Sequence, residues 1–266
     1  MKSIIPILLL SLISIVTNAQ KLPNEQQTSV HAPDAIKVDG KATEWGDKFQ
    51  AYNKATDLFY TLSNDDNKLY LTIQATDPAI IRRIISGGIS LTINRSGQKN
   101  NKGAATITYP IFDPKNRFTA VFNRRGDQDS APWYDSVMKV NNTRFADKAK
   151  MVRVTGIPNV DTLISVYNTD GIKTIASFNN KLAYTYELSV SLKQLGLSAG
   201  NSPKFAYQIK INEVEQQGIT IIAKDGTTIT GMTNIDPGQI QSISVTKGGQ
   251  AGQFATYLWS EYTLAK

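Results

Sequence analysis

The sequence contains no cysteine and only one histidine, His31, among its 266 residues. The lack of cysteine excludes disulfide bonds, a lipid-modified cysteine anchor and a cysteine nucleophile, so the fold must be held by its core. A catalytic zinc site takes about three protein ligands, usually including histidine, and serine–histidine catalysis needs a base positioned within the fold. The sequence therefore offers no catalytic constellation, and we expect a protein that is not an enzyme.

Long hydrophobic runs are also missing after the first residues. Residues 4–16 are apolar apart from two serines, follow Lys2 and lead into Thr17-Asn18-Ala19. This is the pattern of a secretory signal peptide cleaved after Ala19, and the run is shorter than the roughly 18–20 residues that span a bilayer. We expect residues 1–19 to be a signal peptide and the mature chain to be periplasmic or extracellular, with no membrane span and no lipoprotein anchor.

The sequence lacks a long basic tract, although its net charge is +7. The densest positive places are the short stretches 82–83, 124–125 and 148–153. A nucleic-acid interface would show a longer basic face with aromatic residues between the charges. We therefore expect no nucleic-acid partner.

What the sequence has in quantity is alternation of hydrophobic and polar residues. The clearest runs are 69–73, 89–93, 184–190 and 205–211. Period-two alternation indicates strands with one buried face, and turn-forming pairs such as Ser96-Gly97 and Asp225-Gly226 separate the runs. The pattern predicts an all-β fold, an antiparallel β-sandwich.

Helical patterns are scarce. Residues 78–86 follow Asp77, a suitable N-cap, and residues 191–197 could form one turn that ends at Gly196. The sequence predicts one or two short helices, too few for a parallel α/β fold. The polar, proline-flanked residues 20–35 are expected to be a flexible N-terminal arm, and residues 36–266 a single β-sandwich domain.

Several segments occur in a characteristic order. They are Val38-Asp39-Gly40 with Glu44-Trp45, the hairpin 64–73, the run 88–94 and the stretch Tyr186–Leu197. In this order they resemble the carbohydrate-binding module family nine within the wider DOMON-like β-sandwich group. The resemblance implies a sandwich fold, a glycan ligand clamped between aromatic rings, a framework role for Trp45 and, in some members, structural calcium. Ser191 stands where the family usually has proline, and residues 218–252 match no part of the pattern.

Trp133 is the candidate ligand platform. It lies in the polar stretch 127–135, next to Tyr134, with little apolar sequence nearby to bury an indole. Sugar C–H groups stack on aromatic faces while polar groups bind the hydroxyls, so we predict that Trp133 and Tyr134 bind a glycan. Tyr109, or alternatively Phe112, would form the opposite wall. The alternative is that Trp133 folds under its own loop.

The other two tryptophans, Trp45 and Trp259, are interpreted as core residues. Trp259 follows the apolar, strand-like run that ends at Leu258. No second loop tryptophan is then left to complete the clamp.

Calcium and haem are the two cofactors to weigh. Asp127, Asp129 and Asp135 place carboxylates at loop spacing, which suggests a structural calcium site, without the full pattern of an EF-hand. Residues 64–66 form another polar cluster, interpreted as a hairpin turn. Some DOMON domains bind haem through methionine and histidine, but no histidine lies in the predicted domain. We expect no required cofactor.

Together these features predict a secreted, non-catalytic binding protein that recognises a carbohydrate or a cell-envelope glycan in a loop-lined cleft. The alternative is a structural or interaction protein of the bacterial envelope without a small ligand. A glycan-active enzyme would need two carboxylates facing each other across a groove. Glu187, Glu213 and Glu215 are available, and we interpret them as solvated or hydrogen-bonded surface carboxylates.

Overall fold

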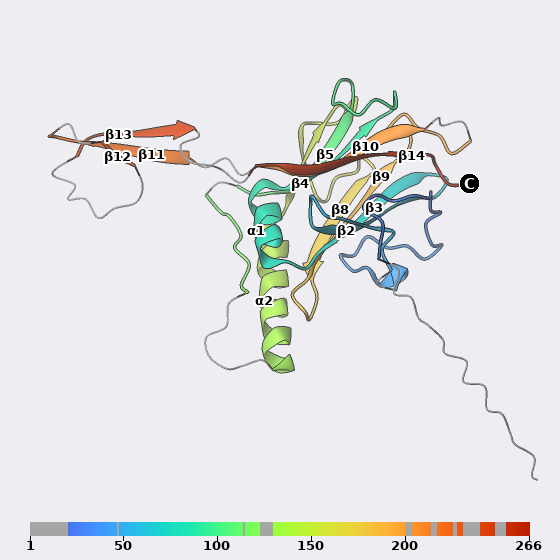
Figure 1. Ribbon diagram of the computed structural model, residues 1–266, viewed down its shortest axis with the longest axis horizontal. Helices are drawn as coiled ribbons and strands as arrows, with labels where there is room; N and C mark the ends of the chain where they lie inside the picture. Colours follow the sequence, from blue (N-terminus) through green and yellow to red (C-terminus); the bar gives the residue numbers. More distant parts are fainter. Residues whose placement is uncertain are drawn as a thin grey trace, which may run out of the picture.

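Two antiparallel sheets form a β-sandwich in the computed structural model (Figure 1). The structure describes residues 21–46, 48–113, 115–122, 130–200, 204–213, 217–225, 228–230, 240–247 and 254–266. The first sheet has the order β1 (Ala51–Asn53), β2 (Leu58–Asn64), β3 (Lys68–Ala75), β9 (Tyr184–Ser191) and β8 (Ile172–Phe178). The second sheet has the order β14 (Thr256–Tyr262), β10 (Phe205–Ile211), β4 (Ile89–Asn94), β5 (Ala105–Ile111), β6 (Met151–Thr155) and β7 (Leu163–Ser165). The predicted all-β sandwich is confirmed.

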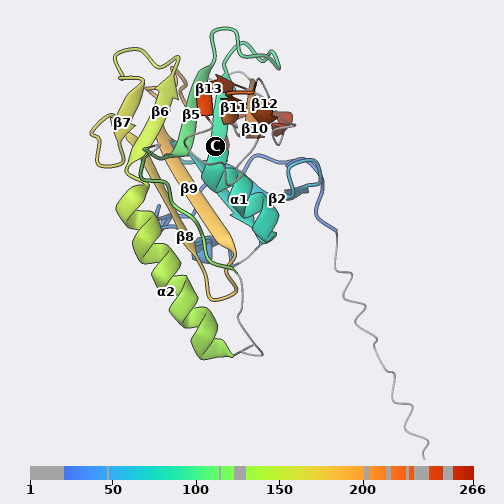
Figure 2. The same cartoon turned by 90° about the vertical axis from the view of Figure 1, so that its left-hand side faces the viewer.

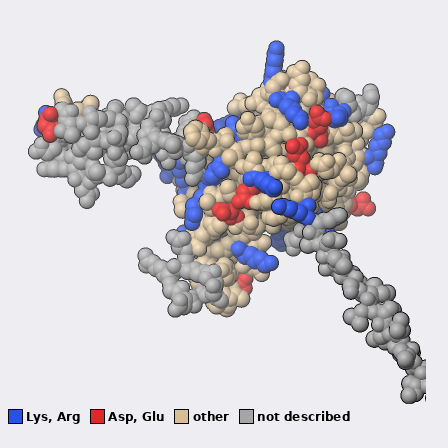
Figure 3. Space-filling model, in the orientation of Figure 1, with Lys and Arg blue, Asp and Glu red and all other residues tan. Residues whose placement is uncertain are grey.

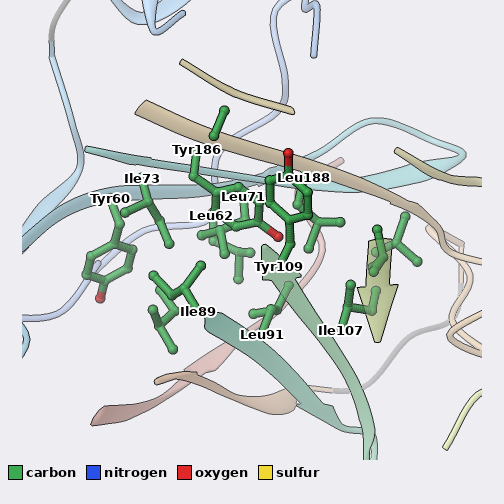
Figure 4. Close-up of a cluster of buried hydrophobic side chains, with 14 of the residues drawn as sticks. Tyr60, Leu62, Leu71, Ile73, Ile89, Leu91, Ile107, Tyr109, Tyr186 and Leu188 are labelled. Atoms are coloured by element: carbon green, nitrogen blue, oxygen red, sulfur yellow. The ribbon is translucent and has the colours of Figure 1, made fainter. Parts of the chain in front are cut away.

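The core lies between the two sheets and follows the predicted alternation. In β3, for example, Leu69, Leu71 and Ile73 are buried against the second sheet. The corresponding residues of β4, β9 and β10 are also buried, so all four predicted runs place one face inward. Figure 4 shows Leu71 and Ile73 on one side of this core, with Ile89 and Leu91 on the other.

Helix α1 (Pro78–Gly87) is the helix predicted after Asp77. The Asp77 carboxylate accepts hydrogen bonds from the backbone N–H groups of Ala79 (2.6 Å) and Ile80 (3.3 Å), which is the N-cap arrangement. The second predicted helical segment, 191–197, is a hydrogen-bonded turn that ends at Gly196, where φ is +63°.

Helix α2 (Ala131–Lys148) was not predicted. Its residue Phe145 packs against five aromatic rings, those of Tyr109, Phe112, Phe118, Phe178 and Tyr184, with centroid distances of 5.3–6.4 Å. Figure 2 shows α1 and α2 on the same side of the sandwich. In the described part of the chain, no helix has the length and apolar character needed to cross a membrane.

The described part of the predicted flexible arm packs on the sandwich instead of extending into solvent. The Gln26 side chain is buried, and its amide binds the backbone N–H (2.8 Å) and C=O (2.7 Å) of Leu62. The Val30 backbone is hydrogen-bonded to Asn64 and to the Tyr262 hydroxyl. The prediction failed because composition does not show that β1 pairs only with residues 58–60, which leaves the backbone of the rest of β2 for such a segment to pair with.

A third, three-stranded sheet is inserted between β10 and β14. It has the order β12 (Thr228–Thr230), β11 (Gln217–Ala223) and β13 (Ile240–Lys247). Figure 1 shows it to one side of the sandwich. Because β10 and β14 pair directly with each other, from Phe205 with Tyr262 to Ile211 with Thr256, the chain leaves the sandwich and returns to the neighbouring strand.

Candidate functional site

The predicted ligand residues Trp133 and Tyr134 do not lie in a loop. They occupy the first turn of α2, where their rings pack edge to face at a centroid distance of 5.0 Å, and both are half-buried. Proline in a first turn, as Pro132 is here, is favourable because that position has no helical N–H partner to lose. They continue the partly buried helix face that leads through Asn141 to Phe145.

Tyr109 is not the opposite wall of a clamp. Its side chain is only 3% exposed and stacks on Tyr186 at 5.7 Å within the core. Tyr109 also contacts Phe145, which is twelve residues and about 18 Å along the helix axis from Trp133. The structure therefore brings Trp133 and Tyr134 together but places Tyr109 apart from them.

Only one of the three predicted calcium ligands lies in the described part of the chain. Asp127 and Asp129 lie outside the described residues, and Asp135 is exposed on α2. Within the described ranges, no three His, Asp or Glu residues gather to hold a metal ion. In the other acidic cluster, the Asp65 carboxylate accepts from Asn67 N and Lys68 N, both at 2.7 Å, which confirms the turn interpretation.

The outer face of the first sheet is covered by the chain that precedes β1. Trp45 donates from Nε1 to Thr72 Oγ1 at 3.1 Å, so its half-buried ring lies over this face. The prediction that Trp45 is a core residue is therefore wrong. Glu187 also points to this side, but its carboxylate accepts from Asp39 N and Gly40 N at 2.8 Å each. Only 2% exposed, it is not a solvated surface group.

Burial raises the pKa of Glu187 to about 7, even though the two backbone N–H donors favour the charged form. The charges of Glu44 and Asp39 also raise this pKa, but Glu187 is buried under the segment that carries them and does not face a groove, and Glu213 follows β10 in the other sheet. Glu215 lies outside the described residues. The described carboxylates thus do not form the pair that a glycosidase needs.

The outer face of the second sheet is different, because aromatic and polar side chains share it. Strand register places two rows of residues across this face. We call them the Trp259 row, which is Trp259, Gln208, Thr92, Thr106 and Thr155, and the Lys210 row, which is Tyr257, Lys210, Ser90, Thr108 and Arg153.

Trp259 corrects the sequence interpretation. Its neighbours Leu258 and Ser260 are buried toward the core, so the Trp259 ring points outward and is half-buried. Tyr257, two residues earlier on the same face of β14, is 54% exposed. The alternation of Leu258, Ser260 and Tyr262 inward was the sequence signal for this orientation, and the apolar run before it concealed the signal.

Short hydroxyl side chains line the middle of both rows. Ser90 and Thr108 hydrogen-bond to each other at 2.8 Å, and Thr92 and Thr106 do so at 2.9 Å. No hydrogen bond within the described part of the chain uses the side-chain amide of Gln208. The face therefore combines aromatic rings on an edge strand with hydroxyl and amide groups beside them.

A hollow of about 490 Å³ lies at the end of the Lys210 row. Its lining includes three cationic side chains, Arg117, Arg153 and Lys210, and one carboxylate, Glu213. A second hollow, of about 560 Å³, lies at the opposite end of β4 and β5, and none of its lining residues is aromatic. Of these two hollows, the first includes Lys210, the register partner of Tyr257.

The charged side chains are otherwise dispersed. Figure 3 shows Lys and Arg interspersed with Asp and Glu on the face in view.

Comparisons of the chain with models of protein families, with curated proteins and with solved structures found no match. The function must therefore be argued from the site.

Proposed function

We propose that this protein is an exported, non-catalytic carbohydrate-binding protein whose binding surface is the outer face of the second sheet. The observation that carries the proposal is the placement of Trp259 and Tyr257 on one face of β14, beside the hydroxyl and amide groups of both rows. The proposal retains the glycan ligand expected from the sequence but moves the binding surface from Trp133 to Trp259.

The chemistry of the face matches that of a sugar chain. A pyranose ring has an apolar C–H face that stacks on an indole or phenol ring, and hydroxyl groups around its rim that need hydrogen bonds. Trp259 offers the stacking surface, and Gln208, its register partner on β10, has a side-chain amide that can both donate and accept. Gln208 is 6% exposed and Ser90, Thr92 and Thr108 are 2–7% exposed, so a ligand would contact mainly the two aromatic rings, and we expect weak binding, with a Kd of about 10 µM to 1 mM.

Replacement of Trp259 by alanine tests the proposal. Intrinsic tryptophan fluorescence of the mature protein would be titrated with cello-, xylo- and chito-oligosaccharides and with acidic oligosaccharides. We expect a saturable change for at least one sugar, and at least tenfold weaker binding by Trp259→Ala in calorimetry.

Trp133→Ala is the matched control, because Trp133 is the other half-buried tryptophan expected to bind a ligand. Loss of binding in Trp133→Ala with unchanged binding in Trp259→Ala would reject the sheet face and return the site to α2. Absence of any fluorescence change and any calorimetric signal across the sugars would reject the carbohydrate proposal.

The inserted sheet favours a second candidate, an interaction protein of the bacterial envelope. Strands β11, β12 and β13 pair with one another beside the sandwich rather than extending either of its sheets. A sheet of this kind offers edge strands to which a partner chain could add. This candidate would take precedence if no glycan binds and removal of residues 214–253 abolishes retention by isolated cell envelopes.

A further inference from the structure

We propose that the hollow at the end of the Lys210 row binds the carboxylate of a uronic acid, so that the ligand is an acidic glycan. This inference rests on the proposed function and specifies the class of sugar. It concerns Arg153, Lys210 and Arg117, which line the hollow together.

The three cations have no counter-ion in the described structure. Among the described residues, neither arginine nor Lys210 forms an ion pair, and Glu213 is the acidic residue of the lining. The hollow therefore has an excess of positive charge that an anionic group would offset. The planar guanidinium of arginine fits a carboxylate with two parallel hydrogen bonds, and lysine adds a point charge.

The strand register sets the spacing of two of these cations. Lys210 pairs with Ser90, Ser90 with Thr108, and Thr108 with Arg153, so three strand-to-strand steps separate them. Three such steps span about 14 Å between backbones. Because only short hydroxyl side chains lie between them, the two long side chains can approach one ligand group from opposite sides. A hollow of about 490 Å³ is within the size range of small-ligand sites.

The wall of the hollow is fixed before any ligand arrives. The Asn212 side-chain amide donates to the carbonyl groups of Gly87 and Gly88, at 3.1 Å each, and lies 2.9 Å from Ser90 Oγ. A Cβ atom at Gly87 would come within 2.7 Å of the Asn212 carbonyl oxygen, so the close approach requires glycine. A preformed wall lowers the ordering cost of binding.

The rest of the face favours a glycan over a nucleic acid. Beyond the hollow, the Trp259 row carries no charged residue, and the Lys210 row continues only to Tyr257. A nucleic acid needs cations along its whole path, because every nucleotide carries a phosphate. One cationic hollow beside a neutral aromatic face instead suits an acidic sugar with neutral sugars next to it.

The test compares acidic oligosaccharides with their own carboxyl-reduced forms. Glucuronosyl xylo-oligosaccharides and oligogalacturonates would be titrated calorimetrically, before and after reduction of the carboxyl groups, at low and at raised salt. We expect at least one acidic form to bind about tenfold more tightly than its reduced form, with a preference that falls as salt rises. Arg153→Gln with Lys210→Gln should abolish this preference, whereas Lys193→Gln, an exposed lysine at the opposite hollow, should keep it.

The outcomes separate the two proposals. Equal binding of acidic and reduced forms, lost in Trp259→Ala, would overturn the acidic-glycan inference and leave carbohydrate binding intact. An acidic preference that survives in the Arg153→Gln, Lys210→Gln variant would also overturn it. Competition by a single-stranded oligonucleotide at equal charge concentration would overturn it in favour of a nucleic acid. Failure of every sugar to bind would reject both proposals.

Discussion

Glu187 shows how the position of one carboxylate changes its chemistry. Its strand position points it away from the core, as alternation predicts, but the turn at Asp39 and Gly40 closes over it. Sequence alternation reports on which side of a sheet a residue lies. It does not report whether a distant segment covers that side, so alternation alone does not distinguish a solvated carboxylate from the buried, hydrogen-bonded one found here.

The raised pKa of Glu187 predicts a pH dependence of stability. Because the folded protein binds this proton up to about pH 7 while the ordinary pKa of a glutamate is 4.5, the stabilisation is complete below about pH 4.5 and is lost as the pH rises through about 7. The loss should amount to about 3 kcal/mol at most. Urea unfolding between pH 4 and 8 would measure it, and Glu187→Gln should remove this part of the pH dependence.

Asp66→Asn is the control for that experiment, because Asp66 is an exposed carboxylate in a turn. Its pH profile should match that of the wild type. Parallel profiles for wild type and Glu187→Gln would mean that the folded protein does not retain the Glu187 proton.

At the scale of elements, strands were predictable and α2 was not. The strands of the core are recognisable in the sequence by their two-residue alternation. The buried face of α2, by contrast, includes the polar residue Asn141, whose side chain is hydrogen-bonded to the backbone N–H (2.9 Å) and C=O (3.0 Å) of Val121. A helix whose inward face carries such a polar residue has weak amphipathicity in its sequence. The position of Trp133 could not be predicted for the same reason, because it depends on where α2 begins.

Phe145 should account for much of the attachment of α2. Its ring is 1% exposed among five other aromatic rings, so Phe145→Ala removes a large buried side chain and leaves a cavity. We expect the free energy of unfolding to fall by about 3–5 kcal/mol. Chemical denaturation would measure the loss, with Val140→Ala, at a 40% exposed position of the same helix, as the control that changes little.

A loss below about 1 kcal/mol in Phe145→Ala would show that α2 contributes little to the core. The affinity for a neutral glycan should be unchanged in a folded Phe145→Ala protein, because Trp259 lies on the outer side of β14, whereas the rings that Phe145 contacts include Phe112 and Phe118 of the cationic hollow. Lower affinity for a neutral glycan in that variant would place the binding site nearer to α2.

At the scale of the whole molecule, the sandwich and the inserted sheet are separable in principle. β10 and β14 pair along their full lengths, so the sandwich does not need the intervening sheet for its hydrogen bonds. Replacement of residues 214–253 by a short turn should therefore leave a folded sandwich, with stability changed by about 1 kcal/mol or less. Thermal unfolding followed by circular dichroism would test this. If the shortened protein showed no cooperative unfolding transition, the prediction would be wrong.

The order of the strands affects the rate of folding. β3 pairs with β9, so Leu71 pairs with Leu188, which is 117 residues further along the chain, and the second sheet is complete only when β14 pairs with β10. Chains rich in such distant pairings fold slowly, over milliseconds to seconds, because each closure costs entropy before it is rewarded. During synthesis, neither sheet can be completed until most of the polypeptide has left the ribosome. The strand order thus delays the closure of both sheets until late in synthesis, while local hairpins such as β2–β3 are available earlier.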